Sequence, residues 1–168
     1  MSAITVGTIL ISSPALEEPH FAKSIILITE YNTNGAIGFI INKLFPRSLN
    51  ELVEFNFSKV FPMFKGGPIG NESIYFIHRR PDLIEGGIHI VDNIFLGDDF
   101  QQAVANVNSG TMQKNEIKIF IGYCGWDAGD LETEIEEKSW LISTLSPEII
   151  LSQQNNDMLW DNLYNGQV

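Results

Sequence analysis

The sequence predicts a single α+β (mixed α/β) domain, and three observations support that expectation. Its 168 residues are enough for one well-buried core, and no low-complexity linker divides residues 1–168. Short runs rich in β-branched residues recur between turns that contain glycine or proline, which is typical of strands. Helical patterns lie among these strands and at least one hairpin is indicated, so a parallel doubly wound fold is disfavoured.

The first three strands are expected at residues 5–12, 23–30 and 36–42. The first is a β-branched apolar run that stops at a Ser-Pro pair. The second carries apolar side chains on both faces, which indicates a strand in the interior of a sheet. Asn34-Gly35 lies between the second and third strands and is typical of a tight hairpin, so these two strands are expected to run antiparallel.

The middle of the chain predicts a short helix, a turn, two strands and a longer helix. They are expected, in that order, at residues 48–55, 65–70, 73–78, 87–91 and 98–107. Ser48 and Glu51 have the spacing of a capping box, which starts the short helix. Two glycines and a proline mark the turn. Asp98 and Asp99 favour the N-terminus of the longer helix, whose apolar residues keep helical spacing.

The C-terminal part predicts a central strand, a helix, a last strand and two further helical segments. They are expected at residues 116–122, 131–138, 140–145, 146–148 and 157–164. The central strand alternates at first and then becomes wholly apolar. Leu131 and Ile135 give the following helix its buried stripe, and Ser146 precedes Pro147 as an N-cap precedes the first helical residue.

The charge balance argues against a nucleic-acid partner. Ten Lys and Arg stand against 21 Asp and Glu, which gives a formal net charge of −11. Nucleic-acid binding draws most of its affinity from cations that neutralise phosphates. The basic residues are scattered here, with Arg79-Arg80 as their only adjacent pair, so no direct nucleic-acid binding is expected. The ordinary interpretation of the acidity is solubility.

Membrane, metal and cofactor sites are not expected either. The N-terminus has no basic segment before its apolar run, and no window approaches the roughly 18 apolar residues of a spanning helix. A cytoplasmic protein without membrane contact is therefore expected. A single cysteine excludes an internal disulfide and a thiolate-rich zinc site. The closest two histidines, His78 and His89, lie eleven residues apart, which excludes a helical metal site of the HExxH type.

Residues 122–127 form the most distinctive candidate site. Small residues surround Cys124 between an expected strand and an expected helix, an arrangement similar to a nucleophile elbow. The match is partial: a nucleophile elbow has glycines two residues before and two residues after the nucleophile, whereas Gly122 and Gly125 lie two residues before and one residue after Cys124. Six carboxylates and one lysine follow over residues 127–138, and nearby anions oppose thiolate formation. Cys124 is therefore expected to be a small packed residue. Catalysis by Cys124 with His78 as base is the alternative.

A binding surface is the other interpretation of the same region. Asp127 is expected to cap the helix, and Trp126 and Trp140 to anchor it. The glutamates of that helix suit a solvated face, or an acidic surface that a partner recognises. Residues at strand ends and in glycine turns complete the set of candidate binding residues: Asn42, Lys43, Gly66, Gly67, Pro68, Gly122, Gly125, Trp126, Asp127 and Gly129.

Four separated motifs, in order, resemble the AlgH/YqgE-like proteins. They are the segment GTILISSPAL from Gly7, the segment NGAIGFIINK from Asn34, the run Gly66-Gly67-Pro68, and the segment GYCGWDAGDLETEI from Gly122 followed by Trp140. His78 at the end of its strand also agrees. The resemblance covers about residues 7–144. Leu44 departs from it where proline commonly follows Asn-Lys, and Asp127 and Asp130 replace small or amide residues.

The resemblance implies a bacterial, cytoplasmic protein with a mixed, largely antiparallel twisted sheet, partly barrel-like, and helices packed on its outside. The family carries a label of transcriptional regulator through one member's genetic link to exopolysaccharide regulation, and it supplies no catalytic residues. A non-enzymatic regulatory or binding protein is therefore expected, which acts on transcription indirectly through a protein or small-molecule partner. The alternative is an uncharacterised enzyme or redox-sensitive protein that uses Cys124. A monomer or weak homo-oligomer is expected.

Overall fold

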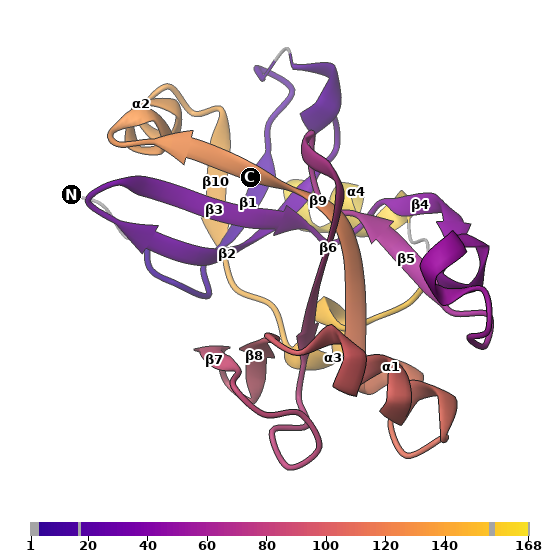
Figure 1. Cartoon of the computed structure of the whole chain (residues 1–168). Helices are drawn as coiled ribbons and strands as arrows, with labels where there is room; N and C mark the ends of the chain where they lie inside the picture. The colour runs from indigo at the N-terminus through magenta and orange to yellow at the C-terminus, as the bar shows by residue number, and fades with distance from the viewer. Residues whose placement is uncertain (1–3, 17, 155–156, 168) are drawn as a thin grey trace.

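The computed structural model describes residues 4–16, 18–154 and 157–167 and confirms a mixed α+β fold (Figure 1). The strands are β1 (Ile9–Ser12), β2 (Ile25–Asn32), β3 (Gly35–Ile40), β4 (Leu44–Ser48), β5 (Pro62–Lys65), β6 (Ile69–His78), β7 (Ile88–Val91), β8 (Ile94–Leu96), β9 (Ile117–Asp127) and β10 (Trp140–Ser143). The helices are α1 (Phe100–Asn108), α2 (Asp130–Glu136), α3 (Pro147–Ile150) and α4 (Asp157–Gln167). Short 3₁₀ turns lie at Pro19–Phe21, Leu49–Glu51, Val53–Phe55 and Lys114–Glu116.

The described strands form one ten-stranded sheet that is largely antiparallel and does not close into a barrel. Eight strands follow the order β10-β1-β2-β3-β9-β6-β8-β7, and β4 and β5 branch from this path. The branch point is β9, which pairs with β3 and β6 antiparallel and with β5 parallel. In Figure 1 β9 runs from beside α1 to beside α2, so it connects the two halves of the molecule.

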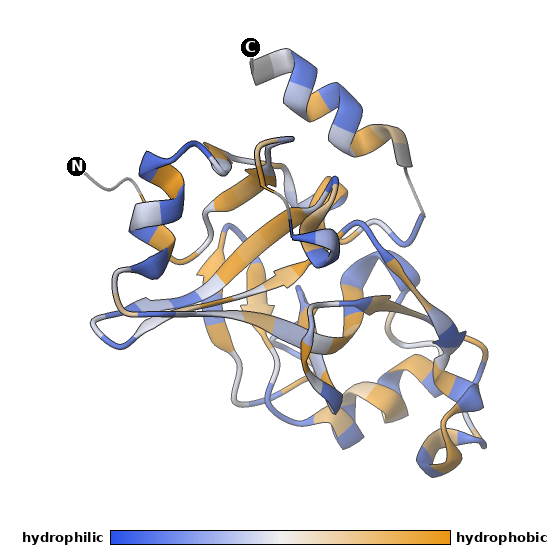
Figure 2. Cartoon of the chain, turned by 90° about the horizontal axis from the view of Figure 1, so that it is seen from above, coloured by the Kyte–Doolittle hydropathy of each residue, from blue (hydrophilic) through white to orange (hydrophobic). Residues whose placement is uncertain are grey.

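The apolar residues of the strands build three buried clusters. One includes Leu27, Phe39 and Phe120, and α4 adds Trp160 to it. A second packs α1 against β6 and β9, and a third packs α2 against β2, β3 and β10. Figure 2 shows the hydrophobic residues concentrated along the central strands, whereas α4 carries hydrophilic residues beside hydrophobic ones. Helices α1, α2 and α4 therefore each pack an apolar side against the sheet from outside.

Elements specified by local patterns are confirmed. β2 and β3 form the expected antiparallel hairpin; Asn32 pairs with Gly35, so Thr33 and Asn34 form its loop and Gly35 is the first residue of β3. Asp99 caps α1 by accepting from the Gln102 amide at 3.1 Å. Ser146 accepts from the Ile149 amide at 3.4 Å at the start of α3, directly before Pro147.

Four expectations are corrected. Residues 48–55 form two 3₁₀ turns instead of one helix, although the Ser48–Glu51 capping box is present. β4, β5 and β8 were not expected. β9 does not end at Gly122 but continues to Asp127. Gly129, in the left-handed region with φ +88°, is the N-cap of α2, so Asp127 does not cap it.

Candidate functional site

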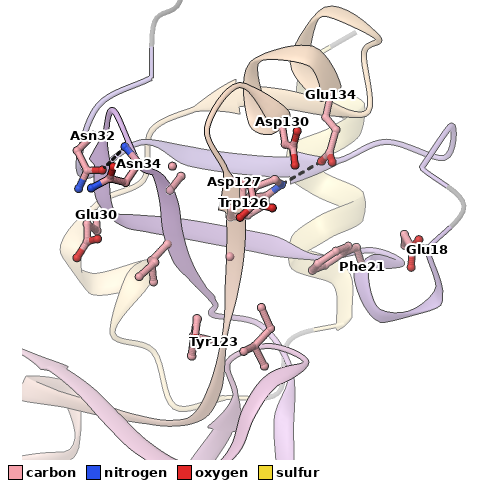
Figure 3. A pocket seen from close by; sticks show the side chains of 15 residues that line it. Glu18, Phe21, Glu30, Asn32, Asn34, Tyr123, Trp126, Asp127, Asp130 and Glu134 are labelled. Atoms are coloured by element: carbon pink, nitrogen blue, oxygen red, sulfur yellow. Dashed lines mark hydrogen bonds between the residues drawn. The ribbon is translucent and has the colours of Figure 1, made fainter.

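An open groove of about 560 Å³ lies where the β2–β3 hairpin, the end of β9 and α2 meet (Figure 3). Five carboxylates line it: Glu18, Glu30, Asp127, Asp130 and Glu134. Aromatic and aliphatic side chains line it as well: Phe21, Ile37, Ile69, Tyr123 and Trp126. The groove therefore combines negative charge with apolar surface.

The hairpin is held against β9 by a close backbone approach. Gly35 pairs with Asp127, and Ala36 pairs with Trp126. Gly35 has φ +135°, and a Cβ at this position would overlap the carbonyl oxygen of Trp126. Only glycine meets both conditions without strain. Asn34-Gly35 thus serves the hairpin and also places the Glu30, Asn32 and Asn34 side of the groove.

One carboxylate oxygen fixes the aromatic wall of the groove. Glu134 Oε1 accepts from Trp126 Nε1 at 3.0 Å and from Trp140 Nε1 at 2.8 Å. The two indoles meet edge to face with ring centroids 6.0 Å apart, and Phe21 stacks on Trp126 at 6.5 Å. Glu134 therefore joins α2 to β9 and β10. From the sequence, Glu134 was expected on a solvated face or on an acidic surface that a partner recognises; the two flanking tryptophans were the signal for its structural role.

Replacement of Glu134 tests whether its hydrogen bonds hold α2 against β9 and β10. Glu134→Ala leaves two largely buried indole N–H groups without their acceptor, which is expected to lower the free energy of unfolding by about 2–4 kcal/mol. Glu134→Gln keeps an acceptor oxygen, so its free energy of unfolding is expected to fall by less than half as much as that of Glu134→Ala. Urea unfolding followed by tryptophan fluorescence measures both. If both variants lower the free energy of unfolding equally, the indole hydrogen bonds do not hold α2 against β9 and β10.

The groove carboxylates have no basic partner in the part of the chain that the structure describes. The ion pairs there join Lys23 to Asp161, Arg79 to Glu148, and Arg80 to both Asp82 and Glu116. None involves a groove carboxylate. Uncompensated charges of one sign around a concave surface concentrate the potential and attract cations.

Cys124 and His78 are not brought together. Cys124 is buried beside Trp126 and Trp140, and its Sγ donates to the Gly66 carbonyl oxygen at 3.4 Å. Burial raises the pKa of its thiol to about 12, so it is protonated at neutral pH. His78 pairs with Ile117 at the other end of β9, seven residues or roughly 20 Å along the strand. His78 therefore cannot act as a base toward this thiol.

The other candidate residues are engaged in packing. Asn42 Oδ1 accepts from the Ile25 amide at 2.9 Å, and Asn42 Nδ2 donates to the Lys23 carbonyl at 3.0 Å. Lys43 Nζ donates to the His20 carbonyl at 3.2 Å, and burial lowers the pKa of this amine.

The glycine loop lies against β9. Gly66 donates to the Ile121 carbonyl at 2.8 Å, so this amide is not free to bind an anion. A Cβ on Gly67 would meet the Cys124 amide nitrogen at 2.6 Å, and Pro68 follows before β6. Gly122, with φ +77°, faces the Gly67 carbonyl oxygen. Of the ten candidate binding residues, Gly125, Trp126 and Asp127 line the groove, and Gly129 follows them as the N-cap of α2.

Lys118 was not among the residues predicted from the sequence to form a site. This lysine stands on β9 with only 1% of its surface exposed and lines a second cavity, of about 270 Å³. A cation flanked by Ile117 and Ile119 in an expected central strand was the signal available for it. Elsewhere in the described ranges, no group of three His, Cys, Asp or Glu side chains is placed to hold a metal ion. No helix in these ranges is long and apolar enough to cross a membrane.

Comparison with protein families gives one match across most of the chain. A family model described as AlgH-like matches residues 9–167. A UPF0301 protein of Cytophaga hutchinsonii is 32% identical over 161 residues, covering 95% of this chain and 88% of that protein. A UPF0301 protein of Chlorobium limicola is 37% identical over 146 residues, covering 87% of this chain and 78% of that one.

Solved structures of other proteins share the fold. The AlgH protein of Pseudomonas aeruginosa superposes with a TM-score of 0.77 at 23% identity, over all of this chain and 93% of that one. Protein DIP2367 of Corynebacterium diphtheriae superposes with a TM-score of 0.78 at 18% identity, over 99% of this chain and 89% of that one. At these identities the likeness extends to the fold alone.

Proposed function

Because this chain belongs to the AlgH-like family, a family without an assigned reaction, we propose that it is a non-enzymatic binding protein that takes a basic segment of a partner protein into the acidic groove. Any effect on transcription is then indirect, through that partner, and the protein acts in the cytoplasm. The observation that supports this proposal is the set of five groove carboxylates without a basic partner among the described residues.

The composition of the groove favours a protein segment over a simple inorganic cation. A lysine or arginine side chain can pair with Asp127 and Asp130 while it lies over an aromatic ring. Ile69 is 43% exposed and lines the same groove, so it offers apolar contact to an aliphatic neighbour of that basic residue. A segment that alternates basic and aliphatic residues suits both features.

The structure gives the Cys124-dependent alternative no geometric support. The thiol is buried and protonated, and His78 is distant along the sheet. The acidic groove also opposes nucleic-acid phosphates, whose charge has the same sign.

The proposal is tested with a short peptide of alternating arginine and leucine as probe. We expect the triple variant Glu30→Gln/Asp127→Asn/Asp130→Asn to bind this peptide at least about tenfold more weakly than wild type in low salt. The loss follows because each substitution removes a groove charge with little change in shape. Isothermal titration calorimetry at low and physiological salt measures it.

A matched control removes the same number of charges elsewhere. Glu54, Glu72 and Glu85 are exposed and lie outside the groove, so their triple glutamine variant is expected to bind within about twofold of wild type at physiological salt. Equal weakening in both triple variants would show that only the net charge attracts the peptide. Tight, salt-sensitive binding of duplex DNA by wild type would contradict the proposed class of partner.

A further inference from the structure

Lys118 is a buried amine without a counter-ion in the described residues. It lies on β9 between Ile117 and Ile119, and its Nζ is 4.1 Å from the ring centroid of Phe64. Nζ donates to the carbonyl oxygens of Ile150 at 3.0 Å and Ser152 at 2.7 Å. No carboxylate among the described residues pairs with it. Burial of an uncompensated ammonium group is unfavourable, so the neutral amine is favoured.

The hydrogen-bond geometry also suits the neutral form. A neutral amine has two N–H groups, and two carbonyl oxygens accept them. The ammonium form has a third N–H, for which Phe64 offers only a ring face. Burial lowers the pKa of Lys118 from the ordinary 10.5 to about 7, which leaves about half of the molecules with a free lone pair at neutral pH.

A small cavity of about 270 Å³ adjoins this amine. Its apolar wall is formed by Ile41, Ile149 and Leu159, and Asn42, Ser152 and Gln154 add polar groups. Glu148 also lines it, but this carboxylate points to Arg79, with Arg79 Nη1 at 3.2 Å. The volume admits a molecule of a few carbon atoms.

We propose that Lys118 is a reactive amine that condenses reversibly with a small aldehyde or ketone bound in this cavity. The Nζ lone pair forms a bond to the carbonyl carbon, while the π pair of the C=O bond moves to oxygen. The two amine protons and the carbonyl oxygen then leave as water, and a C=N bond remains. No oxidant or reductant is consumed. A desolvated lysine in an apolar pocket is the usual setting for such an imine.

Condensation changes the contacts of the C-terminal segment. The imine nitrogen has no N–H left after this step; when it takes up a proton from solvent, the protonated imine has one N–H for one of the two carbonyls, and the water released in the step can donate to the other. Imine formation therefore couples the cavity to Ile150, the last residue of α3, and to Ser152, which follows it. This site is separate from the acidic groove, because the residues lining the two cavities do not overlap.

Reductive trapping tests the proposal on the whole protein. Wild type is incubated with butanal and sodium cyanoborohydride near neutral pH, and modification of each lysine is followed by peptide mass spectrometry. Lys118 is expected to react at least about tenfold faster than the exposed Lys59, Lys65 and Lys114. An ordinary lysine is neutral about a thousandfold less often at this pH, and restricted entry offsets part of that difference. The rate at Lys118 should reach half its maximum near pH 7.

A cavity-filling variant separates the cavity from general reactivity. Ile149 is 38% exposed, so Ile149→Trp can be accommodated while its ring fills the cavity. Modification of Lys118 is expected to fall at least about fivefold, and the three exposed lysines should be unaffected. The proposal is overturned if wild-type Lys118 reacts no faster than those lysines or follows their pH profile. An unchanged Lys118 rate in a folded Ile149→Trp protein would overturn it as well.

Discussion

Gly67→Ala is expected to lower the free energy of unfolding by at least about 3 kcal/mol. The added Cβ would lie 2.6 Å from the Cys124 amide nitrogen and closer still to the Tyr123 carbonyl group. These are backbone atoms of β9, which is paired with β3 and β6 at this point. Relief of the overlap therefore requires the sheet to separate where its branches meet, instead of a side chain changing rotamer.

Gly129→Ala is the matched control. Gly129 also has a positive φ, +88°, but a Cβ there would meet nothing within 4 Å. Gly129→Ala should therefore lower the free energy of unfolding only by the cost of a left-handed backbone at alanine, about 1–2 kcal/mol. Urea unfolding of both variants gives the comparison. If Gly67→Ala is no more destabilising than Gly129→Ala, the glycine loop does not approach β9 as closely as the structure shows.

The stability difference between wild type and Lys118→Met is expected to depend strongly on pH. The pKa of Lys118 is lowered to about 7 in the folded protein from 10.5, so between these values the unfolded chain binds more protons. Wild type therefore gains stability as the pH rises. Relative to Lys118→Met, which does not titrate, the gain from about pH 7 to about pH 10 should be roughly 3 kcal/mol.

The difference between the two proteins is the informative quantity. All other titratable groups are common to both proteins, so their effects cancel in the stability difference. Lys118→Met lacks the hydrogen bonds to Ile150 and Ser152 at every pH, which changes the size of the difference by a constant and not its dependence on pH. Urea unfolding at several pH values gives the curve. Parallel stability profiles for the two proteins would mean that Lys118 keeps an ordinary pKa, and hence that it is hydrated or paired.

The sequence was a good guide where structure depends on neighbouring residues. The Asn34-Gly35 hairpin, the Asp99 cap and the Ser146-Pro147 helix start each need only a few consecutive residues, and all three are present. The mixed α+β class followed from the same local patterns.

Elements that depend on distant partners were missed. β4 contains Pro46 and β5 begins with Pro62, and both are short strands that pair with one another and, through β5, with β9. Gly122 suggested the end of a strand. In the structure its left-handed backbone lets β9 pass the glycine loop and continue to Asp127.

The candidate site shows the same division. The sequence singled out Trp126, Asp127 and Gly125, which line the groove, because they stand together in one motif. Glu30 and Glu18 come from other segments, and only the folded hairpin and the loop before β2 bring them there. The paired hydrogen bonds of Glu134 likewise require the return of β10 beside β9. Contacts of this kind are set by tertiary structure rather than by spacing.

The most direct test of the groove as a binding surface is a ¹H–¹⁵N spectrum of the wild-type protein titrated with the arginine–leucine peptide. The chain contains three tryptophans, Trp126, Trp140 and Trp160, so its indole signals are few and easily assigned. Trp126 lines the groove, whereas Trp160 donates to the Ser12 carbonyl in the core at 2.9 Å. We predict that the Trp126 indole and the Asp127 and Asp130 amides shift while the Trp160 indole does not. Saturating peptide that leaves these three groove signals unmoved would contradict the account.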